Sequence, residues 1–142
     1  MGMAFLLDTC AISELVQANP NAAVVGYLSA LPDAESFISA ISVGEVLYGI
    51  ELLPISAKRR RLEEWYANWV LPHFRGRILP NDLGVMERWG PMMAGLERRG
   101  LKMSIKDSLI AACALAGDLT VITRNEADFA HCGVKMIKPW KI

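Results

Sequence analysis

Short apolar runs alternate with longer segments of helical spacing along the 142 residues, and this alternation narrows the folds open to the chain. We expect helices over residues 11–17, 20–31, 43–53, 56–74, 82–99 and 105–116, with a short turn from Asn125 to Phe129. We expect strands over residues 3–7, 36–41, 76–79, 119–123 and 134–137. Apolar strands separated by helices form parallel sheets that are covered on both faces. The sequence therefore predicts an α/β fold of three layers, α/β/α, around a central parallel sheet of about five strands.

Nothing in the sequence indicates a second domain or a membrane segment. No repeat, linker or low-complexity tract interrupts it, so residues 1–142 are expected to form a single domain. The longest clean apolar run, residues 109–116, is shorter than the roughly 18 residues that span a bilayer. Residues 1–50 contain no Lys or Arg with which a signal peptide could begin. The three cysteines (Cys10, Cys113 and Cys132) are widely spaced, so we expect a cytoplasmic protein without disulfides.

The charges balance overall but are unevenly distributed. Fifteen Lys and Arg residues offset fifteen Asp and Glu residues, yet residues 1–50 carry acidic residues alone. Balanced charge argues against unspecific electrostatic binding of nucleic acid and leaves room for a local basic surface beside an acidic site. The basic run Lys58-Arg59-Arg60-Arg61 has two readings, a solvated helix face or a contact with RNA phosphates.

Acidic residues follow the expected strands or begin the helices beside them. Asp8 directly follows the first strand, Glu45 lies three residues after Ser42, and Asp107 lies three residues after Ser104. Each has a purely structural explanation, because Asp8 suits a helix N-cap and the two Ser-x-x-acid segments suit capping boxes. Asn125 and Asp128 follow the fourth strand and are expected at the same edge of the sheet.

The meeting of these acids at one edge is the stronger indication. In open parallel sheets, ligands bind outside the carboxyl ends of the strands. Two carboxylates about 5 Å apart repel by roughly 3 kcal/mol at an effective dielectric constant of ~20, and a bound divalent cation removes that cost. A ligand set of oxygens, without His or Cys, favours Mg²⁺ or Mn²⁺. Such a site is suited to phosphate chemistry.

Six segments, taken in order, carry a family resemblance that covers nearly the whole chain. They are residues 6–15 (LLDTCAISEL), 39–50 (SAISVGEVLYGI), 76–82 (GRILPND), 104–112 (SIKDSLIAA), 123–129 (TRNEADF) and the final Pro139-Trp140. Each is weakly specific alone, and together they resemble the PIN-domain family. Within it they are similar to the VapC toxins of type II toxin–antitoxin systems, in particular the FitB-like branch.

The resemblance implies a metal-dependent endoribonuclease that leaves a 3′-hydroxyl and a 5′-phosphate. It carries over Asp8, Glu45 and Asp107 as the catalytic acids. Asp8 and Asp107 would be direct ligands of Mg²⁺ or Mn²⁺, and Glu45 would be a ligand or a base that orients water. It also implies that the hydroxyls of nearby residues hold these carboxylates, and these residues are Thr9, Ser42, Ser104 and Thr123. Arg124 beside the site is a candidate for contact with the substrate or the acidic cluster.

Two positions depart from the family pattern. Asn125 stands where relatives often carry Asp, which removes one charge and keeps an oxygen ligand. Cys10 stands where Asn is common, and a thiol is a weaker hydrogen-bond donor than an amide.

The resemblance further implies a homodimer with a VapB-like antitoxin, whose C-terminal segment wraps the toxin. Operator DNA would be bound mostly through the antitoxin. An alternative is a non-enzymatic regulator that serves as a dimeric scaffold for a DNA-binding antitoxin. A third reading, a receiver or aspartate-based phosphatase, is disfavoured because no second acid stands at Cys10 and because Arg124, not Lys, follows the late strand.

Overall fold

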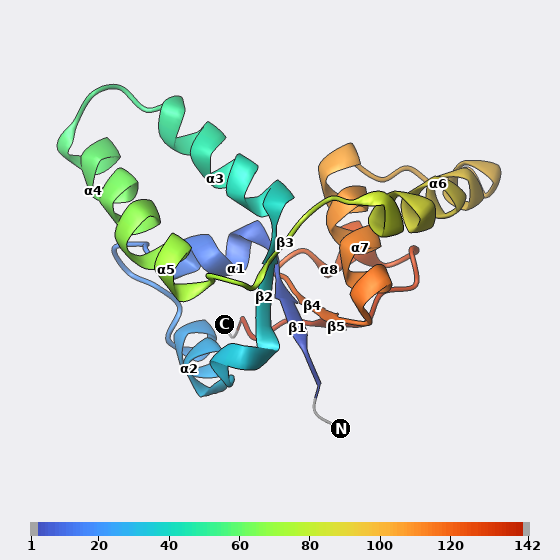
Figure 1. Ribbon diagram of the computed structural model, residues 1–142, viewed down its shortest axis with the longest axis horizontal. Helices are drawn as coiled ribbons and strands as arrows, with labels where there is room; N and C mark the ends of the chain where they lie inside the picture. Colours follow the sequence, from blue (N-terminus) through green and yellow to red (C-terminus); the bar gives the residue numbers. More distant parts are fainter. Residues whose placement is uncertain (1–2, 141–142) are drawn as a thin grey trace.

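The computed structural model describes residues 3–140, which form five strands and a series of helices (Figure 1). The elements in chain order are β1 (Phe5–Leu7), α1 (Thr9–Glu14), α2 (Ala22–Ala30), the 3-10 turn η1 (Asp33–Glu35), β2 (Ser36–Ser39), α3 (Ala40–Glu51), α4 (Ala57–Trp65), the π-helical turn η2 (Tyr66–Val70), α5 (Leu71–His73), β3 (Ile78–Leu79), α6 (Leu83–Arg98), α7 (Ile105–Gly117), β4 (Thr120–Ile122), α8 (Glu126–Phe129) and β5 (Met136–Ile137).

The strands form one parallel sheet in the order β3-β2-β1-β4-β5. Strand β1 is central, and its Leu6 is in register with Phe37 of β2 and Val121 of β4. The carboxyl ends of all five strands therefore meet at the same edge of the sheet. This arrangement confirms the predicted α/β class with a parallel five-stranded sheet.

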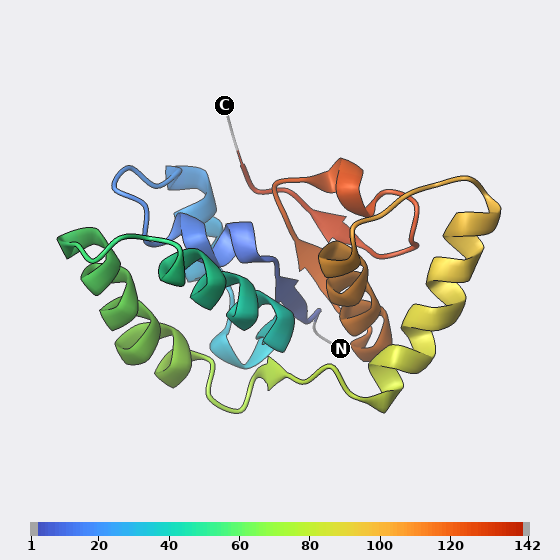
Figure 2. The ribbon, with the colours of Figure 1, turned by 90° about the horizontal axis from the view of Figure 1, so that it is seen from above.

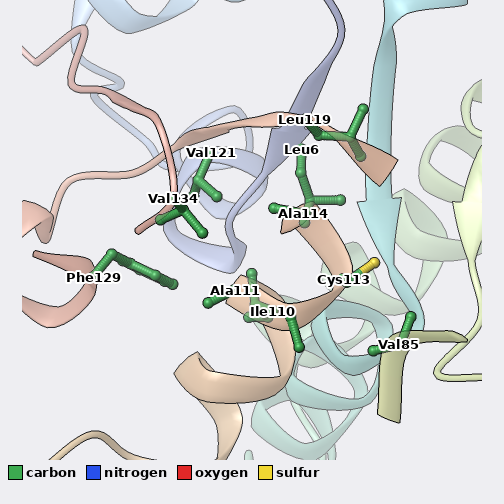
Figure 3. Close-up of a cluster of buried hydrophobic side chains, with 11 residues drawn as sticks. Leu6, Val85, Ile110, Ala111, Cys113, Ala114, Leu119, Val121, Phe129 and Val134 are labelled. Carbon is green, nitrogen blue, oxygen red and sulfur yellow. The ribbon is translucent and has the colours of Figure 1, made fainter. Parts of the chain in front are cut away.

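Helices cover both faces of the sheet because its strands bury apolar side chains on both sides. Leu6 and Val121 belong to a core cluster with α6, α7 and α8, in which Ile110 and Phe129 are fully buried (Figure 3). Phe5 and Leu7 belong to the cluster on the opposite face, with residues of α1, α2, α4 and η2. Figure 2 shows α6 and α7 side by side on one side of β1, and α1, α2 and the α4–α5 segment on the other.

Helices α6 and α7 have side-chain caps, and the cap at Ser104 confirms a prediction from the sequence. Asp82 caps α6 by accepting a hydrogen bond from Val85 N, and Ser104 caps α7 by accepting one from Asp107 N. Gly100 follows α6 with a φ of 70°, in the left-handed region that favours glycine. The helix expected over residues 56–74 exists as α4, η2 and α5 in succession.

The predicted start of the third helix is wrong. Helix α3 begins at Ala40 without a loop after β2, and Ser39 caps it by accepting from Ile41 N. Ser42 and Glu45 therefore lie inside the helix and do not form a capping box. The apolar run that predicts a strand extends through Ile41. In the structure, Ile41 lies in the first turn of α3 and packs against the core from there.

Smaller boundary differences have local causes. Helix α1 starts at Thr9, directly after Asp8, and α2 starts at Ala22 because Asn21 caps it. Helix α7 ends at Gly117, one residue later than expected, and Asp118 follows it in the left-handed conformation. Asn125 precedes α8, but its side chain makes no capping hydrogen bond.

Candidate active site

Polar side chains gather where the three central strands end. Asp8 follows β1, Thr123 follows β4, and Ser42 and Glu45 stand on the first turns of α3, which continues from β2. Because β1 lies between β2 and β4, these segments are neighbours in space although they are far apart in the sequence. Asp8, Thr123, Ser42 and Glu45 therefore gather at the carboxyl edge of the sheet, and we call this edge the rim.

Asp8 is the buried centre of this group, with 6% of its surface exposed. Its Oδ1 accepts from the backbone N–H of Thr9 over 2.7 Å, and its Oδ2 accepts from the Thr123 hydroxyl over 2.9 Å. The N–H that it binds is the first of α1, so the carboxylate also sits at a helix N-terminus, where negative charge is favoured.

The pKa of Asp8 is nevertheless raised above its ordinary value. Burial is the main cause, because it disfavours the charged form. Hydrogen bonds from Thr123, Thr9 and Cys10 lower the pKa and offset part of this effect, while the negative charge of Asp107 raises it further. The negative charge of Asp107 therefore lies near enough to Asp8 to disfavour its ionised form.

The hydroxyl of Thr9 links α1 to α3. It donates to Glu45 Oε1 over 2.8 Å and is hydrogen-bonded to Ser42 Oγ over 3.0 Å. Ser42 is fully buried, whereas the Glu45 side chain is 24% exposed. Ser42 therefore contacts Thr9 from inside α3, on the same helix face as Glu45, because residues three apart lie on one face of a helix.

Lys106 also reaches this rim, and the sequence analysis did not single it out. Its ammonium group lies 3.7 Å from Glu45 Oε2, so the start of α7 is tied to α3. A basic residue in the first turn of a helix opposes the helix dipole, and this unfavourable placement was the available signal.

Asp107 is half-buried and is held by its own helix cap. Ser104 Oγ accepts from Asp107 N over 3.1 Å and donates to Asp107 Oδ2 over 2.8 Å. The serine hydroxyl therefore both caps α7 and orients the carboxylate. Asp107 Oδ1 makes no hydrogen bond within residues 3–140.

Cys10 takes part in the Asp8 network as a weak partner. Its Sγ donates to Asp8 Oδ2 over 3.5 Å and accepts from Arg124 N over 3.3 Å. Burial, with a further contribution from the Asp8 charge, raises the pKa of Cys10 to about 11. The thiol therefore stays protonated at neutral pH and remains a donor.

Of the remaining candidates, Arg124 and Asn125 adjoin the site through their backbone N–H groups. Asn125 N donates to Thr123 Oγ1 over 3.0 Å, which places the backbone of Asn125 beside the Asp8 network. The side chains of Arg124 and Asn125 are exposed. Asp128 is exposed on α8, and its carboxylate forms no hydrogen bond or ion pair within the described residues.

Asp8 and Asp107 each keep a carboxylate oxygen of the kind that hard divalent cations prefer. Asp8 Oδ1 has a single hydrogen-bond donor and Asp107 Oδ1 has none within residues 3–140, so each keeps lone pairs for a ligand. Glu45 differs, because Thr9 and Lys106 occupy its two oxygens. No three His, Cys, Asp or Glu side chains in the described part of the chain are grouped so that they could hold one metal ion.

Comparisons with known proteins agree with this architecture. A family model described as PIN domain matches residues 5–135. The chain is 36% identical over 135 residues to Toxin FitB of Neisseria gonorrhoeae, covering 95% of this chain and 97% of that protein. It is 34% identical over 136 residues to VapC ribonuclease Y4jK of Sinorhizobium fredii, covering 96% and 97%. A solved structure of FitAB bound to an IR36 DNA fragment matches with a TM-score of 0.91 and 35% identity, covering 97% of this chain and 96% of that chain.

In this chain a parallel sheet lies between two helical layers, and acidic side chains lie at its carboxyl edge. These features place the chain in the class of α/β proteins with an acidic site at the edge of the sheet. The chain belongs to the PIN-domain family. Its similarity to VapC and FitB proteins extends over nearly its full length, which confirms the predicted resemblance.

Proposed function

We propose that this protein is a Mg²⁺- or Mn²⁺-dependent endoribonuclease and the toxin of a VapBC-type toxin–antitoxin module. The observation that carries the proposal is geometric: the buried carboxylate of Asp8 lies at the end of β1, and the ion pair of Lys106 with Glu45 holds the start of α7, which carries Asp107, against the same edge of the sheet. The similarity to a protein named VapC ribonuclease supports the same activity.

Asp8 and Asp107 would hold the divalent cation, with Glu45 beside them. The bound cation supplies charge neutralisation at the phosphate and lowers the pKa of a coordinated water. Thr123 and the Thr9 N–H fix the two oxygens of Asp8, and Ser104 fixes Asp107. Supporting hydrogen bonds of this kind orient carboxylate ligands and tune their basicity.

Glu45 would orient the attacking water; Thr9 fixes its Oε1, and Lys106 lies beside its Oε2. In the proposed hydrolysis, the water oxygen bonds to phosphorus and the bond from phosphorus to the 3′ oxygen breaks. The 3′ oxygen leaves with a proton as a hydroxyl, and the phosphate stays on the 5′ end of the other fragment. Lys106, 3.7 Å from Glu45, places a positive charge where phosphate oxygens approach the site.

The partners follow from the same family. We propose a homodimer that binds a VapB-like antitoxin in the cytoplasm and reaches operator DNA through that antitoxin. The similarity to the FitAB complex on DNA supports this assembly. No helix within residues 3–140 is long and apolar enough to cross a membrane.

Cleavage of a labelled RNA by the purified, antitoxin-free chain tests the activity. The reaction is run with Mg²⁺, with Mn²⁺ and with EDTA, for the wild type, Asp8→Asn, Asp107→Asn and the control Asp118→Asn. Asp118 lies at the opposite end of α7, in a surface ion pair with Lys135. We expect metal-dependent cutting by the wild type and the control, and none by the two site variants. Full activity in either site variant would show that the site is wrongly assigned.

The alternative function is that of a non-enzymatic scaffold for a DNA-binding antitoxin. The ion pair between Lys106 and Glu45 favours it, because this contact occupies the third carboxylate of the rim. A folded wild type that binds Mn²⁺ and its antitoxin, but leaves every tested RNA intact, would support the scaffold. Cys10→Asn and Asn125→Asp would then be the first substitutions to test for a gain of cleavage.

A further inference from the structure

A groove of about 430 Å³ opens beside the acidic site, between α1 and the α3–α4 hairpin. Thr9 and Glu45 belong both to the site and to the lining of this groove. Glu45 and Ile50, both in the lining, are separated along α3 by about 7.5 Å of helical rise. The groove is therefore continuous with the site and extends away from it toward the turn between α3 and α4, the two neighbouring helices seen in Figure 2.

The four basic residues at the start of α4, residues 58–61, have different surroundings in the structure. Arg59 forms ion pairs within the chain, with Glu51 over 3.0 Å and with Glu63 over 3.8 Å. It also donates to the carbonyl of Leu53 over 2.9 Å, so it holds the corner between α3 and α4. Arg60 is exposed and is not part of the groove lining.

Lys58 and Arg61 face the groove instead. They are three residues apart and so lie on the same side of α4. Neither forms an ion pair with any residue in the described range 3–140. Because residues 1–50 contain no Lys or Arg, these two side chains supply the positive charge of the groove lining.

The rest of the lining is suited to bases more than to a second charged surface. Val46, Ile50 and Leu62 provide apolar contacts, and Trp65 presents an aromatic side chain at the end of α4. Grooves that combine cations for the phosphate backbone with aromatic and apolar surfaces for bases are typical of single-strand nucleic-acid binding.

We propose that this groove binds the single-stranded RNA that flanks the cleaved phosphate, with Lys58 and Arg61 contacting its phosphates. The inference rests on the proposed ribonuclease function and adds to it a path for the substrate. An RNA strand that is cut at the rim must continue beyond it. The groove adjoins the rim, and its lining carries Lys58 and Arg61, which form no ion pair within residues 3–140. The acidic rim repels phosphates, so cations at a short distance along the strand are needed to hold it.

Binding of a fluorescein-labelled, unstructured RNA of about 12 nucleotides tests this path by fluorescence anisotropy. Asp8→Asn serves as the background, so that the RNA stays intact. The groove variant is Lys58→Gln with Arg61→Gln, and the control is Arg60→Gln with Arg98→Gln. The control removes the same net charge from exposed positions outside the groove. Thermal melts establish that all proteins are folded.

We expect the groove variant to bind the RNA about tenfold more weakly. Its plot of log K against log salt should be shallower by about 1.4, because each lost phosphate contact on a single strand removes about 0.7. The control should change neither quantity to this extent. Equal weakening in both double variants would overturn the inference, since it would reveal only a general charge effect.

Two further outcomes separate the groove from the function itself. Unchanged RNA affinity together with loss of the co-expressed antitoxin on purification would make the groove a protein-binding surface and overturn the inference. Cleavage of the same RNA by the wild type is measured in parallel. Cleavage with no effect of Lys58 and Arg61 rejects the groove alone, whereas neither cleavage nor binding rejects the proposed function as well.

Discussion

The hydroxyl of Thr123 donates a hydrogen bond to Asp8 Oδ2 over 2.9 Å, although 115 residues separate the two positions. Both side chains are buried, at the ends of the neighbouring strands β4 and β1. A charge-assisted hydrogen bond in such surroundings stabilises the ionised carboxylate and fixes its direction. This contact makes the sheet itself the support of the proposed site.

Thr123→Val keeps the shape of the side chain and removes this donor. Because the lost bond favours the ionised form, the pKa of Asp8 should rise further above its ordinary value. The acid limb of a pH–rate profile should therefore move to higher pH. The free energy of unfolding at neutral pH should fall by about 1.5–3 kcal/mol, as for other hydrogen bonds to charged groups. Thr123→Ser keeps the hydroxyl and should behave as the wild type; a valine variant with an unchanged profile would contradict this role.

Asp8→Asn should not destabilise the fold at neutral pH. Folding raises the pKa of Asp8, so its contribution to stability is most favourable below the unfolded pKa and is lost as pH rises through the folded pKa. Neutral Asn avoids that loss and the repulsion from Asp107. We expect an equal or higher Tm for the variant at pH 7. Millimolar Mn²⁺ should raise the Tm of the wild type only, and an equal rise in both proteins would place the cation elsewhere.

Cys10 should react slowly with iodoacetamide although it is only partly buried. With a pKa of about 11, the thiolate is a minor species at pH 7.5, and alkylation should be about 100-fold slower than for a free cysteine. The rate should increase about tenfold per pH unit between pH 8 and 10. Asp8→Asn should accelerate the reaction by removing the nearby negative charge. Peptide mass spectrometry follows Cys10 separately from Cys113 and Cys132, and rapid labelling at pH 7.5 would refute the prediction.

Lys106→Gln should strengthen the binding of Mn²⁺ by about two- to fivefold, as measured by calorimetry. The Lys106 side chain is 64% exposed, so its pairing with Glu45 is worth no more than about 1 kcal/mol. Its removal eliminates a positive charge and frees Glu45 Oε2. Lys135→Gln is the matched control, because its ion pair with Asp118 lies at the far end of α7. Equal or weaker Mn²⁺ binding in Lys106→Gln would show that Lys106 does not compete with the cation.

The sequence by itself determined the features that depend on local interactions. The α/β alternation predicted the parallel sheet, and the Ser-x-x-acid pattern predicted the cap at Ser104, because a cap is made by residues three apart. The position of Asp8 after β1 and of Asp107 at the start of α7 followed from the same local rules. The family could be recognised because its motifs lie in short continuous segments.

The tertiary structure decided the contacts between distant segments. The bonds of Thr9 to Glu45 and of Lys106 to Glu45 join three different elements, and no spacing along the chain encodes them. The predicted start of α3 was wrong because Ser39 and Ser42 are equally good caps locally, and in the folded chain it is Ser39 whose hydroxyl accepts from Ile41 N. The basic residues of α4 look alike in the sequence. In the folded chain, Arg59 pairs with Glu51 at the corner between α3 and α4, whereas Lys58 and Arg61 line the groove. Burial and long-range pairing set these roles, and both exist only once the chain has folded.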